Sequence, residues 1–374
     1  MRKFLSIFLI LTMLLSFAGC SQEIVENTES APTIENTETT EQTEIIEDDP
    51  VPTTEPPTEP ETEPIVTEPP EFDITMSFTG DMMLAAYEGH SYKSSFTYYA
   101  DTQEPSYFLE KVKHIFEDDD FTVGNLENVL TDRSLNKRDK GSGRAFWFKA
   151  PTAYTEILTC SSFEGVSLAN NHTYDFKQAG YDDTIEAVKN AGLNYGSEEK
   201  IMYFEKEGFV IAIICNGLWY EEQADDIIDR IKEAEENSHF QIVFYHGGTE
   251  KAHAPENWRV RASRKLVDNG ADLVLGNHPH VLQPRETYNG VEIIYSMGNF
   301  CYGGHTAPQN RTMIYQIFLT INKETHDIVT YSSNIIPCYV YTGSGNNFQP
   351  AIIEDEAEKQ RVLDFMNGLL DLPY

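Results

Sequence analysis

The segment Ala271-Asp-Leu-Val-Leu-Gly-Asn-His-Pro-His-Val-Leu-Gln-Pro284 joins a short apolar run to two histidines. Residues 273–275 predict a buried strand, and the Gly-Asn pair after them favours a turn. Pro279 favours an extended conformation at His278, and residues two apart in an extended chain point to the same side. We therefore expect His278 and His280 to face one point beyond the strand end, where open α/β sheets bind ligands. Taken alone, the segment also fits a polar surface loop.

Four other predicted strands, at residues 74–81, 121–127, 165–168 and 241–245, also end in residues that can bind metal. A single carboxylate at such a place is usually solvated, and a single histidine is usually only hydrogen bonded. Several of them at equivalent places predict one shared site at an edge of the sheet. The residues at the five strand ends are Asp81, Glu127, Asn171 with His172, His246, and His278 with His280.

This set of side chains indicates which ions the site would bind. Imidazole and carboxylate ligands suit Zn, Mn or Fe, whereas Ca prefers oxygen ligands alone. The set is larger than one tetrahedral ion needs. Two divalent ions, about 3.5–4 Å apart and bridged by a carboxylate, are the usual arrangement for phosphoester hydrolysis.

Helices and strands alternate through the middle of the chain, and strands predominate later. Helical patterns are found at residues 108–116, 153–159, 180–191, 222–236, 258–267 and 355–370. Further strands are expected at residues 210–215, 292–295, 313–321 and 327–335. This order predicts a layered α/β domain with a mixed sheet.

The N-terminal part of the chain differs in composition from the rest. The 374 residues carry a net charge of −34, and residues 21–71 contribute 14 Glu and 2 Asp with no Lys or Arg. A Glu/Thr/Pro-rich segment of this kind cannot bury enough apolar surface to offset its chain entropy, so residues 20–71 are expected to be a disordered acidic tether. Residues 72–374 form the expected folded domain. They carry 45 acidic and 25 basic residues, a net charge of −20 that argues against a nucleic-acid partner.

The first residues have the features of an export signal. Arg2 and Lys3 precede an apolar run over residues 4–15, and Ser16-Phe17-Ala18-Gly19-Cys20 resembles the bacterial lipobox, with Phe17 in place of the usual Leu. The resemblance implies that residues 1–19 are a lipoprotein signal peptide. It also implies that a lipid on Cys20 anchors the protein at the extracytoplasmic face of the bacterial membrane. An ordinary secretory signal with a chance cysteine is the alternative.

An ordered set of motifs connects the chain to a known family. The motifs are Gly80-Asp81, Asn125-Leu-Glu127, Leu168-Ala-Asn-Asn-His-Thr-Tyr-Asp175, His246-Gly-Gly-Thr-Glu250, His278-Pro-His280 and Tyr295-Ser-Met-Gly-Asn-Phe300. Together they resemble the CapA-type poly-γ-glutamate capsule biosynthesis family, within the calcineurin-like metallophosphoesterase superfamily. The resemblance implies a four-layer α/β/β/α metallophosphoesterase-like sandwich with mixed sheets and metals at the strand ends.

The resemblance also implies roles for individual residues. Glu127 matches the bridging carboxylate, and His172 matches the catalytic histidine. The first motif reads Asp81-Met82-Met83 where the superfamily has Asp-x-His, which leaves one metal site a ligand short. The residues that match metal ligands are Asp81, Glu127, Asn171, His246, His278 and His280.

Other polar residues receive smaller roles. Asp175 is expected to accept a hydrogen bond from His172 and so to orient its ring. Arg144 and Lys149 could bind a substrate carboxylate or phosphate, although a solvated strand edge fits them equally well. Glu250, close to His246 in the sequence, is a further candidate for substrate binding.

Two classes of function follow from these residues. The first is a surface-anchored, metal-dependent hydrolase or transferase acting on a phosphoester or on an amide of an anionic γ-glutamyl polymer. The second is a non-catalytic accessory of polymer synthesis or export that binds membrane synthase subunits. A polymer- or wall-binding module is a third and weaker alternative, because no part of the sequence favours it.

Overall fold

The computed structural model describes residues 70–374, except 88, 143–144 and 305–309. The expected signal peptide, almost all of the expected tether, and the candidate residues Cys20 and Arg144 lie outside the described residues. No helix among the described residues has the length and apolar character needed to cross a membrane.

The larger of the two main sheets is mixed. β1 runs parallel to its neighbours β2 and β13 and antiparallel to β14. In spatial order its strands are β16 (Ala351–Ile352), β15 (Ile328–Tyr339), β14 (Thr312–Asn322), β1 (Glu71–Met83), β2 (Phe121–Leu126), β5 (Gly165–Ser167) and β6 (Asn194–Gly196), with β13 (Asn299–Tyr302) also paired to β1.

The second main sheet is also mixed, with a parallel centre and antiparallel edges. In spatial order its strands are β11 (Leu282–Tyr288), β12 (Val291–Met297), β10 (Leu273–Asn277), β9 (Phe240–His246), β8 (Phe209–Gly217) and β7 (Met202–Lys206). The short strands β3 (Val129–Leu130) and β4 (Lys149–Ala150) pair separately.

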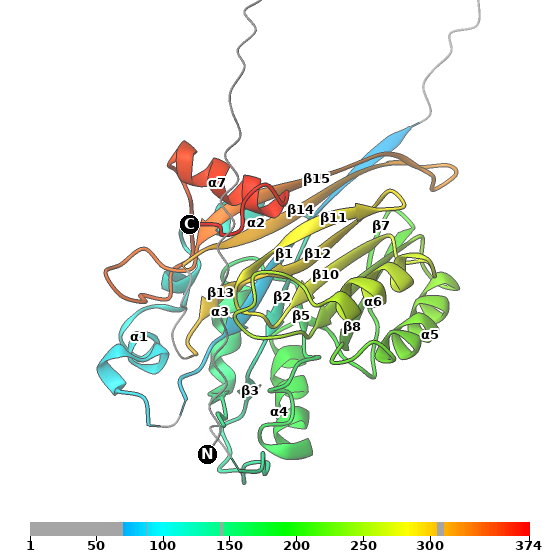
Figure 1. The fold of residues 1–374 in the computed structure, drawn as a ribbon. Coiled ribbons are helices and arrows are strands. Elements are labelled where there is room, and N and C mark those ends of the chain that lie inside the picture. The colour runs from blue at the N-terminus through cyan, green and yellow to red at the C-terminus, as the bar shows by residue number, and fades with distance from the viewer. Residues whose placement is uncertain (1–69, 88, 143–144, 305–309) are drawn as a thin grey trace, which may run out of the picture. The chain divides into compact units, whose positions relative to one another are not determined.

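Helices cover the outer faces of the two sheets, as Figure 1 shows. The α-helices are α1 (Phe96–Thr102), α2 (Lys113–Glu117), α3 (Thr155–Thr159), α4 (Lys177–Asn190), α5 (Gln223–Glu235), α6 (Asn257–Val267) and α7 (Glu356–Met366). The 3-10 helices are η1 (Tyr92–Ser94), η2 (Pro105–Phe108) and η3 (Thr152–Tyr154).

Three buried clusters define the layers. The central cluster joins the inner faces of the two sheets, where the rings of Phe78 and Phe244 lie 6.1 Å apart. A second cluster packs α3 and α4 against the larger sheet, and a third packs α5 and α6 against the smaller one. This arrangement confirms the predicted α/β/β/α sandwich.

Strand β8 shows how the sequence produces these layers. Ile211 and Ile213 belong to the central cluster, whereas Ala212 and Ile214 belong to the cluster under α5 and α6. Side chains alternate along a strand, so a strand covered on both faces needs apolar residues at every position. The continuous apolar run at residues 210–215 has this character.

Some sequence-based boundaries were wrong. Residues 108–116 do not form one helix; η2 ends at Phe108, and α2 begins only at Lys113. Of the alternating stretch expected to be a strand at residues 144–149, only Lys149 is in a strand among the described residues. The short strands β3, β6, β13 and β16 and the longer strands β7 and β11 were not predicted. The cysteines at positions 160, 215, 301 and 338 are all free.

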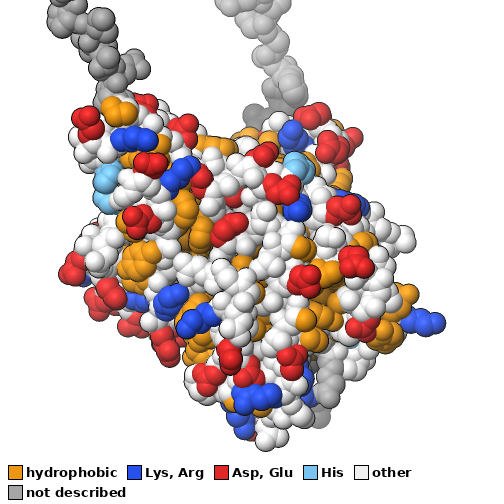
Figure 2. All heavy atoms as spheres, turned by 180° about the vertical axis from the view of Figure 1, so that it is seen from behind, with side chains coloured by type: hydrophobic (Ala, Val, Ile, Leu, Met, Phe, Trp, Pro, Cys, Tyr) orange, Lys and Arg blue, Asp and Glu red, His pale blue; other side chains and the backbone are white. Residues whose placement is uncertain are grey.

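The surface carries charges of both signs. On the face that Figure 2 shows, acidic side chains are scattered among basic and apolar ones and do not gather in one patch. On this face, the negative charge is therefore distributed among basic and apolar side chains.

Candidate metal centre

The predicted metal ligands meet where the two sheets present the carboxyl ends of their parallel strands. Asp81 lies in β1 opposite Asn125 of the parallel strand β2, and Glu127 directly follows β2. From the other sheet, His246 ends β9 and lies opposite Asn277, which ends β10. The sequence analysis placed all ligands at an edge of one sheet; the structure corrects this, because the ligands come from both.

Glu127 lies at the centre of the site. Its Oε1 atom is 3.6 Å from Nε2 of His246, 3.8 Å from Nε2 of His280 and 3.9 Å from Nε2 of His172. The side chain is fully buried, and neither carboxylate oxygen has a hydrogen-bond partner among the described residues. A buried carboxylate without a partner is costly, so the surroundings of Glu127 fit a site for a cation.

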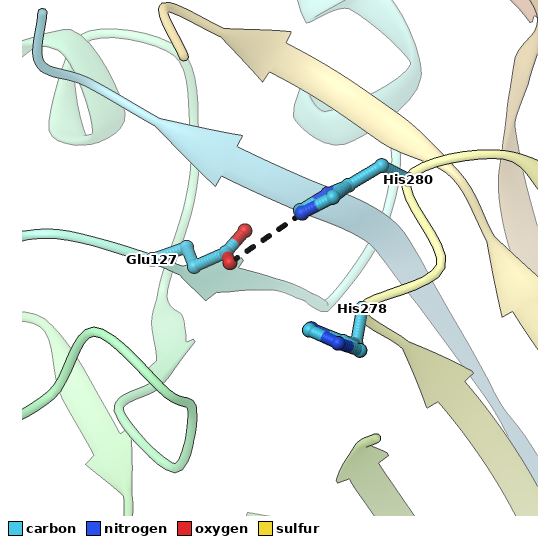
Figure 3. Close-up of side chains that lie close together, drawn as sticks. All are labelled: Glu127, His278 and His280. Atoms are coloured by element: carbon cyan, nitrogen blue, oxygen red, sulfur yellow. Dashed lines mark ion pairs between the residues drawn. The ribbon is translucent and has the colours of Figure 1, made fainter. Parts of the chain in front are cut away.

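Figure 3 shows Glu127 and the two histidines of the 271–284 segment pointing into a common space. Glu127, His278 and His280 each offer a ligand atom, and these atoms lie within 4.8 Å of one another. All three residues are buried. This distance is compatible with shared coordination of a metal ion.

Asp81 and His280 form one side of the site. Oδ2 of Asp81 lies 3.1 Å from Nδ1 of His280 and accepts a hydrogen bond from the backbone N–H of His278, also at 3.1 Å. Oδ1 accepts a hydrogen bond of 2.8 Å from the Asn125 amide. The Asp81 carboxylate is therefore held by groups from both sheets.

His246 forms the other side together with Asn171 and His278. Its Nε2 atom lies 2.8 Å from Oδ1 of Asn171 and 3.0 Å from Nδ1 of His278. Together with Glu127, these residues offer two imidazole nitrogens, one amide oxygen and one carboxylate, which is enough for a four-coordinate ion.

The backbone at the two histidines differs from the prediction. His278 has φ of 95° and His280 has φ of 59°, so the segment is not extended as Pro279 was expected to make it. Their rings are nevertheless only 5.6 Å apart. Positive φ is unfavourable for residues other than glycine and persists where the surroundings enforce it. The hydrogen bonds from His278 N–H to Asp81 and from Lys251 N–H to the Pro279 carbonyl hold this turn.

His172 is oriented as the sequence predicted. Its Nδ1 atom lies 2.8 Å from Oδ2 of Asp175, a fully buried residue that also accepts a hydrogen bond from the Phe148 backbone. The other ring nitrogen, Nε2, faces Glu127. Lys140 forms an ion pair with Asp175 and places its amine 3.3 Å from Nδ1 of His172.

Burial and charge shift the pKa values of the central groups in opposite directions. Burial raises the pKa of Glu127 well above its usual value. Burial alone would do the same to Asp81, but hydrogen bonds from His246 and His280 hold its pKa below the ordinary range. For His280 burial acts downward, and the negative charges of Glu127 and Asp81 outweigh it and raise the pKa to about 9.

The remaining imidazoles are kept neutral. Burial lowers the pKa of His246 and of His172, in both cases against an opposing carboxylate. Burial lowers the pKa of His278 further, with help from the neighbouring His246 and His280. Neutral imidazole is the form that binds metal ions.

Of the described residues predicted to bind substrate, Glu250 lies near the centre and Lys149 does not. Glu250 is exposed, and its negative charge acts on Glu127 and His280, so it lies near the centre. The Lys149 amine donates to the Arg133 carbonyl at 3.1 Å and lies over the Phe176 ring. These contacts do not bring Lys149 to the ligand cluster.

Several residues at the site were not predicted. Asn299 places Oδ1 2.9 Å from Nδ1 of His280, and the Tyr302 hydroxyl lies 3.5 Å from Nε2 of the same ring. The Trp219 ring lies 5.0 Å from that of His278. Asn299 lies in the quoted 295–300 motif, so its position was a usable signal; Lys140 and Trp219 had no comparable signal.

Met83, at the position where the superfamily motif has histidine, is fully buried in the apolar cluster beneath the helices of the larger sheet. It lies opposite Tyr302 of β13. Met83 therefore adds no metal ligand to the group around Asp81 and His280.

The residues present fit a metal centre. The donors are imidazole nitrogens, carboxylate oxygens and an amide oxygen, which suit Zn, Mn or Fe. The unpartnered Glu127 oxygens lie between two groups of such donors, one around His246 and one around Asp81. A divalent ion in either group would compensate the buried carboxylate.

Comparison with protein families agrees with the motifs. Residues 75–303 match the family described as "Bacterial capsule synthesis protein PGA_cap". This match spans most of the two-sheet domain, from β1 to β13.

Individual relatives have low sequence identity to this chain. The chain is 28% identical over 256 residues to the "PGA biosynthesis protein CapA" of Bacillus subtilis (strain 168), covering 61% of this chain and 63% of that protein. It is 26% identical over 325 residues to the "Capsule biosynthesis protein CapA" of Bacillus anthracis, covering 79% and 75%. Among solved structures, a "novel phosphatase" from Mycoplasma pneumoniae matches 71% of this chain and 94% of that one, with 13% identity and a TM-score of 0.41.

Proposed function

The chain belongs to the PGA_cap family of bacterial capsule synthesis proteins, and we propose on this basis that it acts in poly-γ-glutamate biosynthesis or export. We further propose that it is a metal-dependent hydrolase with a dinuclear centre, anchored at the extracytoplasmic face of the membrane through a lipid on Cys20. Its substrate would be an anionic polymer or a phosphoester.

One observation carries the hydrolase proposal: the buried, unpartnered carboxylate of Glu127 within 4 Å of three imidazole nitrogens. A purely structural role does not account for it, because a buried carboxylate without hydrogen bonds destabilises the fold. Divalent ions bound here would lower the pKa of a bound water and neutralise charge on the reacting group.

Side chains of the protein would supply the remaining functions of the site. With Nδ1–H donated to Asp175, the neutral His172 ring would take up a proton at Nε2 from the attacking water and then pass it to the leaving group. Asn171 and Asp81 would hold the ions together with the histidines they contact, His246 at 2.8 Å and His280 at 3.1 Å. Trp219, packed on the rings of His246 and His278, would limit the access of water from that side.

The metal content of the full-length protein, measured by mass spectrometry after purification, tests the centre. The His278→Ala/His280→Ala variant should lose the bound ions. The His239→Ala/His326→Ala variant is a matched control, because these two rings contact each other outside the centre, 5.1 Å apart. A wild-type protein that holds no ion after refilling with Mn or Zn would rule out the metal-dependent hydrolase.

A non-catalytic accessory role in polymer synthesis is the second candidate. Met83 favours it, because this residue is packed in an apolar cluster where related enzymes have a ligand. An accessory should co-purify with membrane synthase subunits even when His172 is replaced by Ala. A hydrolase should lose its activity in that variant.

A further inference from the structure

A cavity of about 500 Å³ adjoins the metal centre. Asn171 belongs to both, since it lines the cavity and contacts His246. Trp219 also lines the cavity, and its ring lies 5.0 Å from His278. A substrate bound at the ions would therefore extend into this space.

One wall of the cavity is basic. Arg138 and Lys140 both line it, within a chain whose residues 72–374 have a net charge of −20. Lys140 is already engaged with Asp175, whereas the Arg138 guanidinium has no hydrogen-bond or ion-pair partner among the described residues. Arg138 is exposed, and a guanidinium without a partner in the protein is the group that an anionic ligand would use.

The Arg138 backbone is held in place. Its N–H donates to the Asp175 carbonyl at 2.8 Å, and its carbonyl accepts a hydrogen bond of 2.7 Å from the Trp147 indole. The segment is thus tied to the residue that orients His172. The base of the Arg138 side chain therefore has a defined position relative to the centre.

The cavity also contains groups that distinguish between anions. Glu198 lines it and accepts a hydrogen bond from the Gly217 N–H at 3.2 Å. Its negative charge disfavours a phosphate dianion, but its oxygens can accept hydrogen bonds from an amide N–H or an ammonium group. The aromatic rings of Tyr174 and Trp219 add surface for the carbon chain of a ligand.

The geometry points to a subsite for an amino-acid unit: Arg138 binds a carboxylate of the substrate, and Glu198 accepts a hydrogen bond from its N–H group. This inference rests on the proposed function and narrows it, because it selects a polymer of acidic amino acids over a phosphoester. Lys140 contributes positive charge to the same wall while it holds Asp175.

Calorimetric titration of the full-length protein tests the subsite with three probes: a γ-linked glutamate trimer, the same trimer with its carboxylates amidated, and inorganic phosphate. The wild type should bind the trimer and discriminate against the other two. Arg138→Gln should weaken trimer binding about tenfold, the usual loss for one charge-assisted hydrogen bond. Arg138→Lys should restore part of the affinity.

Two variants serve as references. Arg361→Gln replaces an exposed arginine of α7 and should bind the trimer as the wild type does. Glu198→Gln should lower the ratio of trimer affinity to phosphate affinity. Equal trimer binding by the wild type and Arg138→Gln would overturn the inference, as would Arg138-dependent binding of phosphate alone.

Metal content measured on the same samples separates this inference from the hydrolase proposal. Arg138-dependent trimer binding by a protein without ions would support the subsite and reject the metal centre. A metal-loaded protein that does not bind the trimer would reject the subsite and leave the centre standing.

Discussion

Asp175 contacts His172 through a 2.8 Å distance between Oδ2 and Nδ1, and this contact aims the opposite ring nitrogen at Glu127. The Asp175→Asn variant should retain a side chain of the same shape beside His172 but lack the negative charge of the carboxylate. We expect hydrolysis to fall by on the order of a hundredfold, because the ring is no longer held in one tautomer. Kinetics with a γ-glutamyl oligomer and a phosphoester would measure this loss.

Nitrogen NMR of His172 would provide a second readout for that variant. The tautomer should change, while the metal content stays at the wild-type level. A variant that has lost its ions would instead assign Asp175 a role in building the centre.

The Glu127→Gln variant should separate stability from metal binding. In the metal-free protein, removing a buried and unpartnered charge should raise the free energy of unfolding by about 1–3 kcal/mol. The same change should reduce metal affinity at least tenfold. Thermal unfolding with and without a chelator tests both effects, and Glu236→Gln, an exposed carboxylate at the end of α5, is the matched control. A metal-free Glu127→Gln protein less stable than the wild type would contradict the ligand assignment.

The two halves of the centre should differ in metal affinity. The half around His246 has four ligand-type groups, whereas the half around Asp81 lacks the histidine that Met83 replaces. Tyr302→Phe should weaken the second half further, roughly tenfold, because its hydroxyl is next to His280. Metal titration would show one tight and one weak site, with only the weak site affected.

Tyr315→Phe is the control for that substitution, since this buried hydroxyl bonds to Glu292 in another part of the core. An equal loss of metal affinity in both variants would assign the effect to general destabilisation.

The metal-free protein should lose stability as the pH rises. The pKa of His280 is raised from 6.5 to about 9, so the folded state retains a proton that the unfolded state releases. Stability from this group is complete below pH 6.5 and disappears as the pH rises to about 9. The raised pKa of Glu127 acts in the same direction from pH 4.5 upward. Unfolding measurements in chelator should show this slope, and His280→Asn should reduce it above pH 6.5.

The lipid anchor can be tested directly. The full-length protein expressed with its export signal should partition into the detergent phase of Triton X-114, and the Cys20→Ala variant should remain in the aqueous phase. Cys160→Ala, which changes a free cysteine of the folded domain, should partition as the wild type does.

The fold could be predicted largely from periodicity and motif order. Continuous apolar runs such as 210–215 identified strands covered on both faces, and the structure confirms that placement. The shortest strands, such as β16, escaped detection because two or three paired residues leave no periodic pattern. Sequence alone does not show how neighbouring segments pair.

The residues of the candidate centre were predicted as one group, and the structure brings them together, but their geometry was not predicted. His278 and His280 do face a common point, for a reason opposite to the one expected: a turn with positive φ in place of an extended chain. Lys140 could not be identified because its role depends on a loop whose path brings it to Asp175, 35 positions further along the chain. Such contacts depend on tertiary structure and leave no local signal.

The contact between His278 and Asp81 joins residues 197 positions apart. No growing or partly exported chain that lacks β10 can form it, because β1 must wait for the other sheet. The ligand cluster therefore cannot assemble until the chain is present through His278. We expect the ion that the centre acquires to depend on the compartment in which this step of folding takes place.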